Sequence, residues 1–330
     1  MTATEAIVRD QLVARRARLA ALAASRREAA LVELMRRVDE ALAELEVGTW
    51  GLCTVCHEPL SAASLAGDPL SRVCLECLSL EERHALERDL EAATRVQRAL
   101  LPPVELRHDG WEIRYLWEPR SAVSGDHVDI VRPRDGDGPL HLLFGDVVGK
   151  GVAAALLQAH LHALFRALAT AEANPAELLE RANRQFAEAT AAASYATFAA
   201  LRLAADGRVD LANAGHPRPL LADARGVRPV EGGGLPLGLF AGSRYTGHEL
   251  RLAPGETLLL YTDGWTEAER DGEEYGIGRA AAALRRAARR PLDELLAACR
   301  ADLEAFLAGT PRSDDFTLLA LRRSPVATPG

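Results

Sequence analysis

The chain changes character at Pro102 and Pro103, and this change limits the kinds of structure it can form. Before the prolines, residues 5–46 place leucine and valine mostly three, four or seven positions apart, the spacing of one or two amphipathic helices. Gly48 ends that pattern. After the prolines the apolar runs become short and strand-like, and Asp206 and Gly207 between two of them signal a hairpin. The sequence therefore predicts a helical segment at 1–47 and a separate domain at 104–323.

Six apolar runs after residue 103 are expected to be strands: 111–117, 141–146, 195–203, 208–214, 256–263 and 316–322. Four stretches between them are expected to be helices: 151–172, 175–191, 278–290 and 292–308. Hairpin-linked strands with clustered helices predict an α+β fold of antiparallel sheets flanked by helices, not a doubly wound parallel sheet. Residues 324–330 are expected to be a disordered tail.

Four of the five cysteines form a CxxC, seventeen residues, CxxC pattern within a module expected at 48–80. In a reducing cytosol this pattern indicates metal binding rather than disulfides. Four thiolates can close a tetrahedral site and leave no open position, so the pattern predicts one structural Zn²⁺ held by Cys53, Cys56, Cys74 and Cys77. Cys299, alone in an Ala- and Leu-rich stretch, is expected to be a small buried apolar residue.

A linker helix is expected at 81–103. Its apolar seam has alternating four- and three-residue spacing, which predicts a parallel dimeric coiled coil, or alternatively a helix packed on its own domain. The seam consists of Leu86, Leu90, Ala93, Gln97 and Leu100.

Composition and charge exclude several classes of function. A net charge of −8 disfavours direct nucleic-acid binding, which depends on neutralising phosphates with cationic side chains. The first twenty residues mix acids and arginines before any apolar run, unlike a signal peptide. No stretch approaches 18 uncharged apolar residues, so no membrane span is expected. We expect a soluble, cytoplasmic protein.

Four short acidic motifs lie far apart in the sequence, each beside a glycine or at the end of an expected strand. Strand ends and tight turns let a rigid sheet aim such side chains at one point. Aspartate oxygens suit Mg²⁺ or Mn²⁺, and two such ions bridged by water could hold a phosphate and supply hydroxide near neutral pH. For any single motif, ordinary turn chemistry is the alternative. The acids are Asp126 and Asp129 in SGDHVD, Asp146 in FGDVVGKG, Asp263 in YTDGWTEA, and Asp314 and Asp315 in SDDFT.

The motifs also resemble a known superfamily over nearly all of residues 95–322. The matching segments are RVQRALLPP, the GDxxD step, DVVGKGVAAAL, LANAGHPRPLL, GLPLGL, YTDGWTEA and DDFTLL. They are similar to the PPM (protein phosphatase 2C-like) superfamily, specifically its bacterial SpoIIE/RsbU branch. The resemblance implies a PPM-type α/β sandwich and a metal-dependent serine/threonine phosphoprotein phosphatase with two Mn²⁺ or Mg²⁺ ions. Ser124 and Val128 depart from the usual motif, but neither change removes a carboxylate.

The resemblance also implies roles for individual residues. Asp146 would bridge the two ions, and the Val147 carbonyl would contribute to one of them. Asp263 and Asp314 would complete the ligand set. Asp126 would bind a metal ion or its waters.

Other residues would support the site. Asp129 and Asp315 would assist the acidic motifs, while Gly145 and Gly149 would let the backbone turn tightly around them. For the turn that contains Asn213 and His216, two roles are considered, a packed hydrogen-bonded turn or contact with substrate.

The same branch dephosphorylates small anti-anti-sigma (STAS) proteins and is often regulated through a helix like the one expected at 81–103. Residues 36–77 resemble the DksA/TraR family, in which a helix leads into a four-cysteine zinc finger. We interpret that module as a device for homodimerisation, docking or signal input. The alternative is a transcription regulator that binds RNA polymerase through the zinc module and carries an inactive phosphatase-like scaffold. A cluster of retained, mutually repelling aspartates argues against that alternative.

Overall fold

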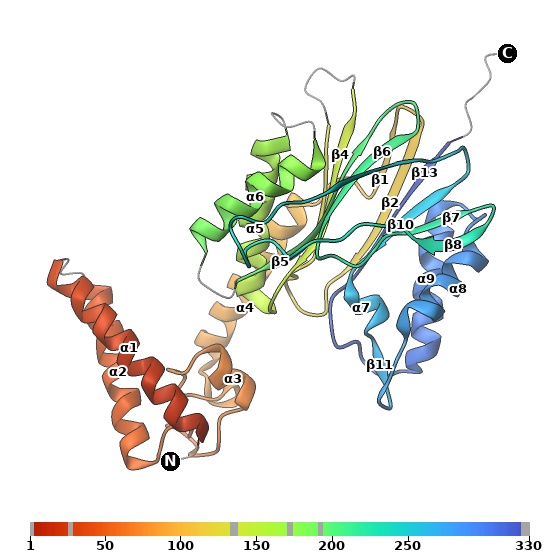
Figure 1. The fold of residues 1–330 in the computed structure, drawn as a ribbon. Helices are drawn as coiled ribbons and strands as arrows, with labels where there is room; N and C mark the ends of the chain where they lie inside the picture. Colours follow the sequence, from red (N-terminus) through yellow and green to blue (C-terminus); the bar gives the residue numbers. More distant parts are fainter. Residues whose placement is uncertain (1–2, 26–28, 133–137, 170–173, 191–193, 325–330) are drawn as a thin grey trace. The chain divides into compact units, whose positions relative to one another are not determined.

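The structure is a computed structural model that describes residues 3–25, 29–132, 138–169, 174–190 and 194–324 (Figure 1). The chain divides into two compact units, residues 1–89 and 90–330. The boundary falls within helix α4 (Leu80–Leu100), so this helix contributes residues to both units.

The N-terminal unit begins with two helices, α1 (Ala3–Ser25) and α2 (Ala29–Val47), which pack against each other. The sequence predicted one or two helices here, and two are present. Apolar side chains at helical spacing form their shared core, and Arg16 on α1 pairs with Asp39 on α2. The core residues are Leu12, Leu19, Val38, Ala41, Leu45 and Leu70. After Gly48, which takes a left-handed conformation (φ 77°), the cysteine segment contains only α3 (Ala62–Gly67) and a 3-10 turn (Leu75–Cys77).

The C-terminal unit contains two antiparallel sheets. The six-stranded sheet has the order β1 (Glu105–His108), β2 (Trp111–Glu118), β13 (Phe316–Arg323), β10 (Thr257–Tyr261), β7 (Leu220–Asp223), β8 (Gly226–Pro229). The five-stranded sheet has the order β3 (His127–Val131), β4 (Leu140–Val147), β5 (Ala196–Leu203), β6 (Arg208–Ala214), β9 (Gly247–Arg251). Two further strands, β11 (Glu269–Arg270) and β12 (Glu273–Glu274), pair as a small ribbon.

The two sheets form the middle layers of a sandwich. Alternating apolar residues from both sheets meet in one core that includes Ile113, Phe144, Leu201 and Leu260. Helices α5 (Gly151–Ala169) and α6 (Pro175–Ala189) cover the outer face of the five-stranded sheet. Helices α8 (Gly276–Ala287) and α9 (Leu292–Leu307) cover the outer face of the six-stranded sheet (Figure 1). The predicted α+β sandwich of antiparallel sheets flanked by helices is confirmed.

Helix α5 has the length and apolar composition of a membrane-spanning helix. The helix nevertheless forms one layer of the sandwich, and its Leu161 and Phe165 are buried in the core beside the sheet. Core helices of globular domains often meet the same criterion.

Some boundaries differ from the sequence prediction. The strand expected to reach residue 263 ends at Tyr261, because Asp263 begins the short helix α7 (Asp263–Thr266). Strand β3 was not predicted, because all five of its residues are buried and it lacks the alternation that marks a half-exposed strand. The ends of the expected helices at 151–172 and 175–191, and residues 325–330 of the expected tail, lie outside the described residues.

The contacts of Gln97 differ from those expected for a residue in a coiled-coil seam. Its side chain is buried and bonds to Ser124, and Thr94 one turn earlier donates a hydrogen bond to the Ala122 carbonyl. The end of α4 therefore packs on its own domain, which was the alternative to the coiled coil.

Candidate active site

The four principal aspartates come from the ends of strands in both sheets. Asp126 directly precedes β3 and Asp146 lies near the end of β4 in the five-stranded sheet. Asp263 follows β10, and Asp314 precedes β13 in the six-stranded sheet. Thr262 connects the two sheets, because its hydroxyl donates a hydrogen bond to Asp126 Oδ2 at 3.1 Å. The sandwich therefore brings segments separated by more than a hundred residues to one edge.

Asp126 is the most enclosed of these acids. Its Oδ2 accepts hydrogen bonds from the hydroxyls of Thr262 (3.1 Å) and Thr317 (2.5 Å), both from the opposite sheet. Burial, reinforced by the nearby negative charge of Asp146, raises the pKa of Asp126 well above its usual value despite these two bonds. Sequence reasoning missed both threonines, although Thr262 lies within YTDGWTEA and Thr317 within SDDFT.

The other acids repel one another. Burial raises the pKa of Asp146 to about 7, and the charges of Asp263 and Asp314 push it in the same direction. Burial and Asp314 likewise raise the pKa of Asp263. Such a cluster is unfavourable when fully ionised, unless cations are bound among the carboxylates.

Among the described residues, no three of these aspartates have their oxygens within 4.8 Å of one another, which is the spacing found in the cysteine cluster described below.

Lys150, the only lysine in the sequence, pairs with Asp314. Its ammonium lies 2.9 Å from Asp314 Oδ2 and donates to the Ser313 carbonyl at 2.9 Å. This lysine lies in the turn between β4 and α5. Its positive charge partly neutralises the aspartate cluster at Asp314. Sequence reasoning did not assign Lys150 to the site.

Asp315 holds the first acidic motif in place. Its Oδ1 accepts from the Arg120 backbone N–H at 2.7 Å, and its Oδ2 accepts from the Ser124 hydroxyl (2.7 Å) and the Gly125 N–H (3.1 Å). These three donors occupy both carboxylate oxygens, so Asp315 positions its neighbours.

Three glycines allow the backbone to approach the acids. A Cβ on Gly145 would lie 2.3 Å from the Thr197 carbonyl oxygen, and Gly149 has a φ of 104°. A Cβ on Gly125 would lie 2.8 Å from both Asp146 Oδ1 and the Val147 carbonyl oxygen. The Val147 carbonyl therefore lies on the same side as the Asp146 carboxylate. Sequence reasoning missed Gly125, although it precedes Asp126 in the motif.

The turn containing Asn213 and His216 is packed and hydrogen-bonded. The Asn213 amide donates to the His216 carbonyl (3.0 Å) and accepts from the His216 N–H (2.8 Å), and His216 Nδ1 lies 2.9 Å from Thr197 Oγ1. Both side chains are buried, and burial lowers the pKa of His216 to about 3. This geometry corresponds to the first of the two roles considered for these residues.

Asp129 faces a different part of the domain from the other acids. Both of its oxygens accept from the Arg166 guanidinium on α5, at 2.7 and 2.6 Å. Strand alternation turns the side chains at 127 and 129 towards α5, away from the core between the sheets where Val128 lies.

Comparison with protein families and with known proteins identifies this arrangement. Residues 136–324 match the model of stage II sporulation protein E, SpoIIE. The chain belongs to the SpoIIE family. Its SpoIIE domain is similar to phosphoserine phosphatase RsbP of Bacillus subtilis, with 30% identity over 188 residues, 54% of this chain and 45% of RsbP. It is also similar to protein IcfG of Synechocystis, with 26% identity over 265 residues, 72% of this chain and 42% of IcfG.

Solved structures support the same fold. The SiaA-PP2C domain of Pseudomonas aeruginosa is 26% identical with a TM-score of 0.63, covering 73% of this chain and 98% of that domain. The RsbU and RsbW domains of a Mycobacterium tuberculosis protein are 32% identical with a TM-score of 0.58, covering 68% and 63% of the two chains. The chain spans about half the length of the curated relatives it matches. The SpoIIE domain thus has the PP2C phosphatase fold.

The four cysteines outside the SpoIIE domain also come together. Their sulfur atoms all lie within 4.8 Å of one another, and Cys56 Sγ is 3.7 Å from Cys74 Sγ. Hydrogen bonds from the backbone N–H groups of Cys56 and Cys74 lower the pKa of Cys53 to about 6, which favours the thiolate that binds metal ions. The structure thus places close together the four cysteines that the sequence analysis grouped as zinc ligands.

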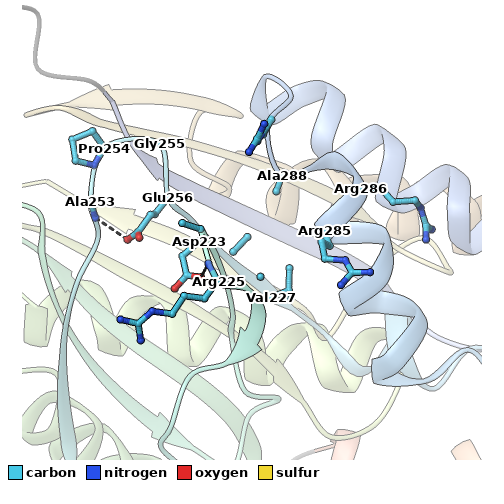
Figure 2. Close-up of a pocket in the computed structure, with 14 residues that line it drawn as sticks. Asp223, Arg225, Val227, Ala253, Pro254, Gly255, Glu256, Arg285, Arg286 and Ala288 are labelled. Atoms are coloured by element: carbon cyan, nitrogen blue, oxygen red, sulfur yellow. Dashed lines mark hydrogen bonds between the residues drawn. The ribbon is translucent and has the colours of Figure 1, made fainter.

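A separate hollow of about 800 Å³ lies on the SpoIIE domain between the β7–β8 turn, the loop before β10 and the end of α8 (Figure 2). Its carboxylates already have partners. Asp223 accepts from Arg225 N–H and pairs with Arg228, and Glu256 accepts from Ala253 N–H. The hollow contains none of the acidic motifs, so it is distinct from the candidate active site.

Proposed function

We propose that this chain is a metal-dependent serine/threonine phosphoprotein phosphatase. The observation that carries the proposal is the group of mutually repelling carboxylates formed by buried Asp126 with half-buried Asp146 and Asp263, whose raised pKa values are those expected where cations bind. Membership of the SpoIIE family and the phosphoserine phosphatase names of RsbP and RsbU support it.

The residues present fit two Mn²⁺ or Mg²⁺ ions. Asp146, Asp263 and Asp314 would hold them together with the Val147 carbonyl, and Asp126 would bind one ion or its waters. All of these donors are hard oxygen atoms, as these cations prefer. When bound, the ions would neutralise the substrate phosphate and lower the pKa of a water molecule so that it can act as the nucleophile.

The chain's own contribution is to position these groups. Thr262 and Thr317 hold Asp126 from the opposite sheet, and Asp315 holds the loop that carries it. Lys150 at the entrance places a positive charge where a phosphate dianion would arrive. No nucleophilic side chain is required.

The substrate we infer is phosphoserine or phosphothreonine on a STAS anti-anti-sigma protein in a partner-switching pathway of the cytoplasm. Support comes from the similarity to RsbP, RsbU and a protein with RsbU and RsbW domains. The N-terminal unit would hold one structural Zn²⁺ through Cys53, Cys56, Cys74 and Cys77, and would serve homodimerisation or signal input.

Hydrolysis of p-nitrophenyl phosphate with Mn²⁺ tests the activity, and the phosphorylated STAS proteins of the same genome, with and without chelator, test the substrate. Asp146→Asn is expected to abolish turnover. Asp271→Asn, which changes an acid with a 91% exposed side chain in the β11–β12 turn, is the control and should be fully active. A chain that binds RNA polymerase but hydrolyses neither substrate would favour the inactive-scaffold alternative.

A further inference from the structure

The geometry points to a transition-metal site between β3 and α5 of the C-terminal unit, formed by His127, Asp129 and His162, that binds one Zn²⁺ or a similar cation. One ligand atom from each of these three residues lies within 4.8 Å of the others. Two come from β3 and one from α5, so a bound ion would fasten the helix to the sheet.

The site lies on the face of β3 opposite the candidate active site. His127 and Asp129 are two residues apart on the strand and point towards α5. Phe165 of α5 and Phe198 of β5 lie beside the His127 ring. Asp126, by contrast, bonds to threonines of the other sheet. The histidine site and the aspartate cluster are therefore separated by the strand itself.

Two buried histidine nitrogens are the strongest observation in favour of this site. His127 is completely buried, and its Nε2 makes no hydrogen bond with any residue that the structure describes. The Nδ1 of His162 is also buried without a hydrogen bond to the described parts of the chain, at 3.6 Å from Asp129 Oδ2. A buried polar atom without a partner is costly, and two such nitrogens beside one carboxylate leave room for an ion that would satisfy both.

The surrounding residues resemble the outer shell of a metal site. The Gln158 amide nitrogen on α5 lies 2.9 Å from His127 Nδ1, and the Gln158 Oε1 has no hydrogen-bond partner among the residues that the structure describes. With that oxygen turned to accept from Nδ1–H, the amide fixes the tautomer in which the Nε2 lone pair is free for a metal ion.

Arg166 pairs with both Asp129 oxygens, but Oδ1 also accepts from the Ile130 N–H at 2.7 Å, so Oδ2 keeps the freer lone pair. The ion pair orients the carboxylate and also weakens cation binding by its positive charge. Two imidazoles and one carboxylate match Zn²⁺ or Co²⁺ better than Mg²⁺, which prefers oxygen ligands alone.

The test measures zinc bound to the full chain after dialysis, with excess Mg²⁺ present to fill the aspartate cluster. His127→Phe suits an aromatic pocket, and His162→Leu alters the helix ligand independently. His160→Gln is the matched control, because His160 lies on the same helix with an exposed side chain. Circular dichroism checks that each variant folds.

We expect His127→Phe and His162→Leu each to bind one equivalent of zinc less than wild type and His160→Gln. In a Co²⁺-substituted protein, the absorption bands of the nitrogen- and oxygen-ligated ion should disappear in the two variants, while the thiolate-to-cobalt bands of the cysteine site remain. Equal zinc content in wild type and the three variants would overturn the inference. Equal zinc content in wild type and His127→Phe would also overturn it. Phosphatase activity is not the readout, so failure here is separate from failure of the proposed function.

Discussion

Gln97 on α4 holds both backbone groups of Ser124 at once. Its amide nitrogen donates to the Ser124 carbonyl at 2.6 Å, and its amide oxygen accepts from the Ser124 N–H at 2.9 Å. Ser124 in turn bonds through its hydroxyl to Asp315, and the Asp126 N–H donates to the same hydroxyl at 3.0 Å. One helix side chain therefore contacts the loop that positions the first acid of the candidate active site.

Removing this contact should loosen the acidic cluster. In Gln97→Ala the buried N–H and C=O of Ser124 lose their partners, at a cost of about 1–3 kcal/mol in the free energy of unfolding. We expect weaker Mn²⁺ binding and a roughly tenfold lower kcat/KM, equivalent to about 1.4 kcal/mol. Val96→Ala, at an exposed neighbouring position, is the control. Titration with Mn²⁺ and steady-state kinetics measure both effects, and identical values for the two variants would contradict the coupling.

The raised pKa of Asp146 predicts an unusual pH dependence of stability. A carboxyl whose folded pKa is about 7, against an ordinary value of 3.8, stabilises the ion-free protein at low pH, and this contribution is lost as pH rises to 7. At pH 8 without divalent ions, Asp146→Asn should therefore be more stable than wild type, by on the order of 3 kcal/mol.

Chemical denaturation at pH 4 and pH 8 measures this effect. Saturating Mn²⁺ should reverse the order at pH 8, because the ions bind the aspartate form. Wild type and Asp146→Asn with equal stability at pH 8 in chelator would show that the carboxylate is not strained by its neighbours.

The cysteine cluster should control the N-terminal unit alone. Cys53→Ser is expected to abolish zinc binding at that cluster and to make residues 1–89 sensitive to protease, because the cysteine segment has little regular structure to replace the metal. Cys299→Ala, which changes a buried cysteine of α9, should keep the full zinc content. Zinc analysis and limited proteolysis distinguish them, and a protease-resistant Cys53→Ser would refute the structural role.

The exposed start of α4 tests the dimer hypothesis. Leu86 is 45% exposed, and Leu90 lies one turn later. If this face pairs with a second chain, replacing both leucines by aspartate should change the sedimentation coefficient and the turnover together. Arg88→Asp, on the opposite side of the helix, is the control. Unchanged behaviour of the double variant in both measurements would remove the idea.

Local sequence patterns determined much of this protein. The helical periodicity, the hairpin signal at Asp206 and Gly207 and the strand-like runs predicted the layered α+β domain, because amphipathic spacing reports which face of an element is buried. The cysteine pairs could be recognised because two CxxC turns supply the four thiolates of a tetrahedral site. The four acidic motifs could be recognised because aspartates beside glycines and at strand ends suit divalent cations.

Only the tertiary structure decided how the acidic residues divide their roles. Asp314 and Asp315 are adjacent in sequence, but one faces Lys150 at the entrance while the other accepts three hydrogen bonds from the first motif. Asp126 and Asp129 separate in the same way, because successive side chains of an extended chain point to opposite faces and only packing determines what each face meets. Sequence reasoning missed Gln97, Thr262 and Thr317 for this reason: their partners lie far along the chain, and only the folded sandwich brings them together.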